Sequence, residues 1–301
     1  MIQPSISPSN CSRNSPSDLE LELSAGTIEY KDTGGDGPAL VFLHGLVMDG
    51  SVFDPVVSDL RRDHRCIVPT LPLGSHRKPM KPDADLSLRG QGQIVAEFLE
   101  RLELSGATLI QNDCAVAQAV VGEWPERVGR LVLAACEAFD NYPPGLPGKN
   151  VALLTRVPGG LNLAMQSMRI RPLRRLPVAI GWLTKRRIPH EITDGWFRPV
   201  QSSRAIRRDL IKYSRAAKPR VMMEATERLR SYRGPTLVIW ASEDRIMPRD
   251  HGRRLADLIP GARLVEVADS YTLIPQDQPQ EFARLIRDFV AETQLPRTPK
   301  A

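Results

Sequence analysis

The stretch that decides the fold is ATLIQNDCAVAQAVVGEW, residues 107–124. It begins with a short apolar run that ends at Ile110, continues with a polar triplet, and then turns to small and apolar residues of helical character. This order predicts a strand, a tight turn and a helix. The turn would hold Asp113 at the carboxyl end of a buried strand, with the amide of Cys114 at a helix N-terminus. We therefore expect a nucleophile elbow, in which a reactive carboxylate and half of an oxyanion hole meet.

The segments that precede this elbow predict a parallel sheet. The run ALVFL at 39–43 is continuously apolar, as is typical of a central strand covered on both faces. Residues 86–104 carry apolar side chains at a helical period and lead directly into the elbow strand. Such alternation of strand, helix and strand favours parallel pairing. Alternating apolar residues between 19 and 30 predict an antiparallel hairpin at the start.

Four motifs carry a family resemblance: LIQNDCAV at 109–116, HGL at 44–46, WPERV with LVLAA between 124 and 135, and ASEDRIMP at 241–248. With them the chain resembles the α/β-hydrolase superfamily, and within it the aspartate-nucleophile branch of haloalkane dehalogenases and epoxide hydrolases. The resemblance implies an α/β-hydrolase fold, with a mostly parallel eight-stranded sheet, flanking helices and an inserted helical cap. In the family, glycines are usual where Gln111, Ala115 and Val116 stand, so we expect a looser or altered turn.

The resemblance also implies catalytic roles. Asp113 corresponds to the nucleophile, Asp244 to the triad acid, and the amides of Leu46 and Cys114 to the oxyanion hole. Halide chemistry is disfavoured, since Leu46 and Cys114 stand where dehalogenases place halide-binding groups. The family's histidine belongs in the loop after the last strand, and here that loop reads ADSYTLIP, with Tyr271 at the expected position. A phenol, with a pKa near 10, is a poor general base near neutral pH but a good hydrogen-bond donor.

Further residues are candidates for the pocket: His44, His76, Asn112, Trp182 and Trp196. Each of the histidines and tryptophans also has a structural interpretation, as a loop brace, an exposed loop residue or part of a lid core. His76 or His190 could supply a relocated base. Two alternatives concern the catalytic positions, namely Cys114 as a thiol nucleophile and Asp244 as a helix cap.

Composition divides the chain into parts. Residues 1–17, rich in Ser, Pro and Asn, predict a disordered tail without a secretory signal. Residues 18–142 and 234–293 form the expected core, and 143–233 the expected cap. Between 151 and 234 we count nineteen Lys and Arg against five Asp and Glu, whereas the remaining chain holds twenty-two against thirty. The basic residues of the cap either form solvated helix faces, attract an anionic substrate, or contact nucleic acid or acidic lipid.

Other bulk features narrow the class of protein. The four cysteines lie far apart, without metal-ligand spacing, which favours reduced thiols in a cytoplasmic protein. No apolar run reaches the length of a membrane span. We expect a small-molecule substrate, with an anionic one as an option, and neither cofactor, metal, nucleic acid nor membrane as a partner. The sequence leaves the oligomeric state open, a dimer included.

Three functions remain open at this level. The first is an epoxide hydrolase-like or ester hydrolase-like enzyme with Asp113 as nucleophile and a displaced base. The second is a repurposed biosynthetic enzyme that performs cyclisation, elimination or isomerisation with Asp113 and Tyr271 as an acid and base pair. The third is a pseudo-hydrolase that binds a small molecule without converting it.

Overall fold

The computed structural model describes residues 18–293. The predicted disordered tail at 1–17, together with Cys11, lies outside the described residues.

The centre of the fold is an eight-stranded sheet of order β1-β2-β4-β3-β5-β6-β7-β8. The pairs β1 with β2 and β2 with β4 are antiparallel, and all later pairs are parallel. The predicted hairpin, mostly parallel sheet and strand count are thereby confirmed. The strands are β1 (Asp18–Leu23), β2 (Gly26–Asp32), β3 (Ala39–Leu43), β4 (Arg65–Pro69), β5 (Ala107–Asn112), β6 (Val128–Ala134), β7 (Thr236–Ala241) and β8 (Arg263–Val267).

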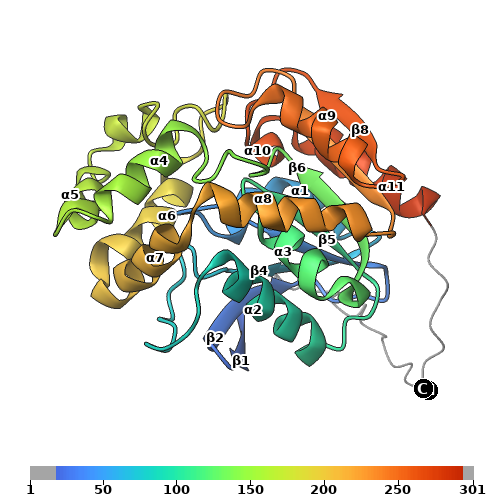
Figure 1. Cartoon of the computed structure of the whole chain (residues 1–301), viewed down its shortest axis with the longest axis horizontal. Helices are drawn as coiled ribbons and strands as arrows, with labels where there is room; N and C mark the ends of the chain where they lie inside the picture. The colour runs from blue at the N-terminus through green and yellow to red at the C-terminus, as the bar shows by residue number, and fades with distance from the viewer. Residues whose placement is uncertain (1–17, 294–301) are drawn as a thin grey trace, which may run out of the picture.

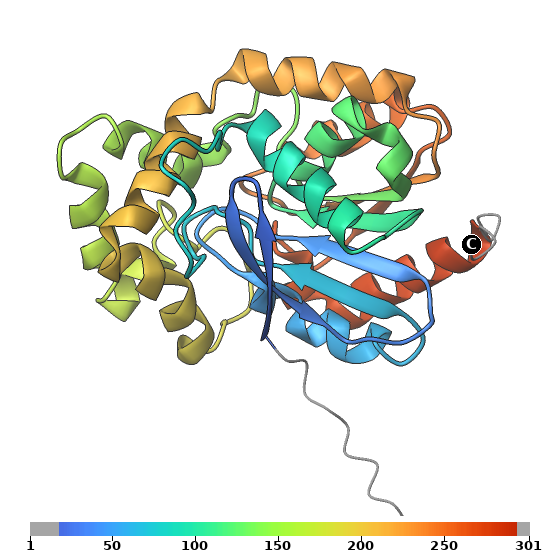
Figure 2. The same cartoon turned by 90° about the horizontal axis from the view of Figure 1, so that it is seen from below.

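Helices cover both faces of this sheet (Figure 1, Figure 2). On one face α2, α3 and α8 pack side by side, and on the other α1 packs against α11. The helices of the core are α1 (Asp54–Leu60), α2 (Leu88–Arg101), α3 (Val116–Glu123), α9 (Arg249–Leu258), α10 (Ile274–Asp277) and α11 (Pro279–Glu292), with short 3₁₀ turns η1 (Gly50–Phe53) and η2 (Pro125–Arg127).

All the secondary-structure elements between β6 and β7 are helices. Its elements are α4 (Gly145–Leu154), α5 (Gly160–Ser167), η3 (Arg171–Arg175), α6 (His190–Ser202), α7 (Arg204–Ala216), α8 (Pro219–Arg228) and η4 (Leu229–Ser231). Helices α4 to α7 gather beside the sheet, whereas α8 returns to pack on α3 (Figure 1). We call residues 143–217, which hold α4 to α7, the helical insert.

The helical insert has a small hydrophobic core of its own. Leu161, Met165, Phe197 and Leu210 are buried together there. Val47, from the loop after β3, joins the same cluster. The insert is therefore packed directly on the loop that follows the central strand. Within residues 18–293, no helix combines the length and the apolar character that crossing a bilayer requires.

Candidate active site

The elbow predicted around Asp113 is present. All six residues of β5 are buried, and Asp113, directly after this strand, has a φ of 57°. This left-handed conformation is uncommon for a residue with a side chain and clusters at functional sites. The side chain of Gln111, which suggested a looser turn, instead accepts a hydrogen bond from the amide of Ala117 at 2.8 Å. Gln111 therefore caps the first turn of α3 from the position where the family usually has a glycine.

The loop after β3 passes directly beside the Asp113 carboxyl. A Cβ atom added to Gly45 would lie 2.2 Å from Oδ2 of Asp113, so only glycine allows this approach. Two residues further on, Val47 has a φ of 52°, which is strained for a β-branched side chain. Among the described residues, the amides of Leu46 and Cys114 donate to no other protein group. Both remain available to a ligand oxygen, as the oxyanion prediction requires.

A cavity of about 240 Å³ lies between Asp113 and the helical insert. Asp113 is the one titratable residue of its lining, and no Lys or Arg of the described chain takes part. The remaining lining is mostly apolar and comes from the insert and two core loops, with Leu46, Val151, Met165, Leu183, Phe197 and Ile246 among its members. A cavity of this kind suits a neutral, largely apolar molecule.

Asp244 occupies the predicted acid position after β7. Its Oδ1 accepts hydrogen bonds of 2.8 Å from the amides of Ile246 and Met247, so the side chain also has the alternative role of a turn cap. A third bond, also of 2.8 Å, comes from the hydroxyl of Thr272. The other carboxyl oxygen, Oδ2, is buried and has no partner among the described residues. Thr272, and not the predicted Tyr271, is therefore the residue of this loop that contacts Asp244.

Tyr271 has a different environment. Its ring is close to two cations, with the guanidinium carbon of Arg245 4.7 Å and the Nζ of Lys185 5.5 Å from the ring centroid. Its amide donates to the buried carboxylate of Asp277 at 2.9 Å. The phenol does not line the cavity around Asp113. The prediction that Tyr271 faces Asp113 is wrong, because the hydrogen bonds of the loop turn the next residue inward.

The two aspartates ionise in a defined order. Burial raises the pKa of Asp244 to about 6, although its hydrogen bonds oppose the shift. Burial raises the pKa of Asp113 well above its usual range, and the negative charge of Asp244 raises it further. Asp244 therefore loses its proton first, and its charge then favours the protonated form of Asp113.

Glu137 is a third buried carboxyl that the sequence motifs missed. Burial, and then the charge of Asp113, raise the pKa of Glu137 well above its usual range. Its Oε2 has no partner among the described residues. Glu137 lies three residues beyond β6, the strand beside β5 in the sheet. Since parallel strands deliver their following residues to one edge, this position was a signal that could have identified it.

No histidine reaches the cavity, although all five lie within the described residues. His44 is buried, its Nε2 accepts from the amide of Leu71, and its Nδ1 contacts the carbonyl of Gly45. Burial lowers the pKa of His44 to about 4, so it is a neutral loop brace. His76 is also buried and its Nε2 lies 3.3 Å from Asp209 on α7. These side chains hold loops together and do not act at Asp113.

The other predicted pocket residues also lie outside the cavity lining. Asn112 braces two loops by donating to the carbonyls of Ala134 and Thr272. Trp196 is buried and donates to the hydroxyl of Ser51, which anchors α6 to the core. Trp182 packs against the main hydrophobic core, and His190 is exposed at the start of α6. None of these residues lines this cavity, and the polar groups of Asn112 and Trp196 are bonded elsewhere.

The thiol alternative at the elbow also fails on geometry. Cys114 is buried, and its Sγ contacts the carbonyl of Leu43 at 3.6 Å. Burial raises the pKa of this thiol well above its usual range, which disfavours the nucleophilic thiolate. Within the part of the chain that the structure describes, no three His, Cys, Asp or Glu residues gather as a metal site would require.

Comparisons with known proteins match this architecture. A 2-hydroxy-6-oxo-6-phenylhexa-2,4-dienoate hydrolase of Comamonas testosteroni is 24% identical over 91% of this chain and 94% of its own length. A cis-3-alkyl-4-alkyloxetan-2-one decarboxylase of Shewanella oneidensis is 24% identical over 86% of this chain and 84% of its own. The crystal structure of a haloalkane dehalogenase from Bradyrhizobium elkani superposes with a TM-score of 0.73 at 18% identity, covering 93% of this chain and 99% of that chain.

A family model matches most of the chain, and not only the single motifs described above. Residues 40–285, from β3 into α11, match the model described as alpha/beta hydrolase family. This range includes the elbow, the oxyanion loop, the insert and the acid loop. The chain therefore belongs to the alpha/beta hydrolase family.

Proposed function

We propose that this protein is an enzyme that acts on a neutral, largely apolar small molecule, with protonated Asp113 as its general acid. One observation supports this proposal above all others. Asp113 is the one titratable group in the apolar lining, and a threonine hydroxyl stands beside Asp244 where ester hydrolysis would need an imidazole. Chemistry that requires a raised carboxyl pKa, and not a histidine, fits these groups best.

The mechanism follows from the position of each group. The free amides of Leu46 and Cys114 bind a substrate oxygen and polarise it. Asp113 transfers its proton to that oxygen as the adjacent bond breaks, and recovers a proton from the substrate in a later step. Asp244 stays ionised, held by the amides of Ile246 and Met247, and its charge keeps Asp113 protonated. Ring opening, elimination and isomerisation all conserve the atoms of the substrate in this scheme.

Strained rings with alkyl substituents are the substrate class to test first. They are neutral, they carry an oxygen that can accept a proton, and their alkyl groups suit the apolar lining. One relative acts, by its name, on alkyl-substituted oxetan-2-ones. We include epoxides in the same class because they present a strained ether oxygen.

Hydrolysis through an ester of Asp113 is the second candidate. It is favoured by the relatives named as hydrolases. It would require ionised Asp113 and a base that activates water. Since burial and the charge of Asp244 oppose that ionisation, we rank it below acid catalysis.

Mass spectrometry in water enriched in oxygen-18 tests the proposal. The protein is incubated with alkyl oxetan-2-ones, epoxides and activated esters. We expect products free of water-derived oxygen, and a loss of about 10²-fold or more for Asp113→Asn, the usual size of a general-acid contribution. Label in every product would instead indicate hydrolysis. Complete recovery of all compounds, with unchanged binding to Asp113→Asn, would indicate a binding protein.

A pH profile separates the two roles of Asp113. A general acid loses activity as pH rises through its pKa, whereas a nucleophile gains it. Asp244→Asn removes the negative charge that raises the pKa of Asp113. We therefore expect the alkaline limb of the profile to move to lower pH in this variant. An activity that rises with pH in both proteins would contradict the acid role.

A further inference from the structure

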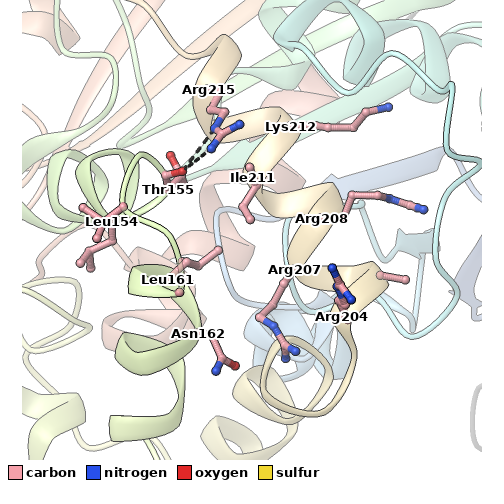
Figure 3. Close-up of a pocket in the computed structure, with 13 residues that line it drawn as sticks. Leu154, Thr155, Leu161, Asn162, Arg204, Arg207, Arg208, Ile211, Lys212 and Arg215 are labelled. Atoms are coloured by element: carbon pink, nitrogen blue, oxygen red, sulfur yellow. Dashed lines mark hydrogen bonds between the residues drawn. The ribbon is translucent and has the colours of Figure 1, made fainter.

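A second and larger cavity lies on the outside of the helical insert. It has a volume of about 930 Å³ and is bounded by α7 on one side and by the segment 154–162 on the other (Figure 3). Leu154 lines both this groove and the cavity around Asp113. We call it the basic groove, because its lining includes Arg204, Arg207, Arg208, Lys212 and Arg215.

The five cations are spaced along α7 so that they share one side of the helix. Their successive separations of three, one, four and three residues place them on the same strip of the helix surface. The lining contains no Asp or Glu. Arg208 does pair with a carboxylate, that of Asp209. The other four cations form no ion pair with any described residue.

Neutral acceptors hold three of these four cations in place. Arg215 donates to the carbonyl of Thr155 across the groove at 2.8 Å, as Figure 3 shows. Arg207 donates to the carbonyls of Val200 and Gln201 at 2.9 and 3.0 Å. Lys212 donates to the carbonyls of Pro82 and Ala84. Carbonyl oxygens orient a cation but leave its net charge uncompensated.

Arg204 is the fourth cation, and it is exposed with no hydrogen bond to a described residue. It precedes Arg207 by three residues, and both guanidinium groups lie at the same end of the groove (Figure 3). Two such groups close together repel one another in the absence of an anion. The planar forks of two arginines match the oxygen atoms of a phosphate group.

We propose that the basic groove binds a phosphate group, with Arg204 and Arg207 as its principal contacts and Lys212 and Arg215 as further positive charge. The phosphate belongs either to a free soluble compound or to a lipid headgroup. The second source has support from the groove's surroundings, since Leu153, Val157 and Leu163 on α4, α5 and their connection are all more than half exposed. The site is separate from the chemistry at Asp113 and goes beyond the proposed function.

Two probes distinguish the sources: inorganic pyrophosphate, and vesicles of phosphatidylcholine with or without phosphatidylglycerol. Binding to the full-length protein is measured by calorimetry and by vesicle sedimentation at low ionic strength. We expect binding to at least one anionic probe, weakened by salt because it is electrostatic. Arg204→Gln/Arg207→Gln should weaken it by about ten-fold or more, as the loss of two charge-assisted contacts implies.

The matched control is Arg249→Gln/Arg253→Gln, which removes two exposed arginines from α9 outside the groove. It should bind like the wild type, and Arg204→Lys/Arg207→Lys should fall between the two. If loss of the Arg207 hydrogen bonds unfolds the first variant, Arg204→Gln alone repeats the test, since Arg204 forms no hydrogen bond to any described residue.

Binding of pyrophosphate alone assigns the groove to free phosphate compounds, and binding of the charged vesicles alone assigns it to lipid. Either result supports the proposal. If the wild type binds neither probe, the proposal is overturned. So would equal loss of binding in the α9 control, which would mean that net charge and not the groove attracts the anion.

Discussion

Thr272 donates its hydroxyl to Asp244, and this bond defines what the acid loop can do. A threonine holds the carboxylate in place but cannot take a proton from water near neutral pH. Its position beside Asp244 is set by residues far away in sequence, since Asn112 binds the carbonyl of Thr272 and Asp277 binds the amide of Tyr271. The loop itself has no periodic pattern, so the sequence could identify the missing histidine but not which residue turns inward.

Replacing Tyr271 or Thr272 by histidine tests which of these two residues faces Asp244. Tyr271→His should give no gain in ester hydrolysis, because residue 271 lies near Lys185 and Arg245 and outside the cavity. It should cost about 1 kcal/mol of stability through the lost cation–π contacts. Thr272→His places the imidazole beside Asp244 instead. Release of nitrophenol from activated esters measures both, and a gain at position 271 would show that the loop is oriented differently.

Asp244 should make stability depend on pH. Its pKa is about 6 in the folded protein and about 3.9 in an unfolded chain. Both states are protonated below pH 4, and between about pH 4 and 6 the unfolded chain gives up its proton first. The contribution of Asp244 to the free energy of unfolding should therefore fall by about 3 kcal/mol across this window and stay level above it.

Urea denaturation at several pH values measures this contribution by comparison with Asp244→Asn. The asparagine keeps an oxygen for the amides of Ile246 and Met247 but has no proton to lose. We expect the variant to gain stability relative to the wild type as pH rises to about 6. A difference that stays constant from pH 4 to 7 would mean that Asp244 is less isolated from water than its burial implies.

At the scale of elements, one side chain of the short helix α10 forms several of the hydrogen bonds between the insert and the core. The buried carboxylate of Asp277 accepts bonds from the hydroxyl of Thr184 and from the amides of Lys185, Arg186 and Tyr271. Ion pairs from Lys185 to Glu243 and Asp269 surround the same junction.

Asp277→Ala should loosen this junction more than the rest of the protein. The change leaves buried donors unpaired and should cost about 2 to 4 kcal/mol. Trypsin should then cleave faster after residues 185–187, as sequencing of the fragments would reveal. Asp288→Ala removes an exposed acid of α11 and serves as the control, for which we expect little change. Equal cleavage in both variants would contradict the role of Asp277.

Elements formed by local patterns were the ones that sequence could predict. The apolar run of β3, the helical period of α2 and the strand, turn and helix around Asp113 each depend on neighbouring residues, and each is present. The cavity lining was not predictable in the same way. Which faces of α4 to α7 meet Asp113 depends on how the insert packs on Val47 and its neighbours, a tertiary contact with no local signal.

At the scale of the whole molecule, the charge of the chain and the polarity of the site are separated. Five basic residues of the insert line the basic groove on its outer side, while the lining that faces Asp113 is mostly apolar and contains no Lys or Arg of the described chain. The sequence showed that the cap carries an excess of positive charge, but it could not show which side of the cap this charge faces. Cations on the outer side do not contact a substrate at Asp113, so the hypothesis of an anionic substrate held by the cap gains no support from the lining.

The apolar lining has a consequence for selectivity among chemically similar compounds. Each methylene transferred from water contributes about 0.8 kcal/mol, or nearly a four-fold gain in affinity. In a homologous series of alkyl compounds, binding should therefore tighten steadily with chain length until the 240 Å³ are filled, and then weaken sharply. The fixed volume beneath the insert would therefore limit the length of the alkyl chain that binds, and so select among compounds that share the same functional group.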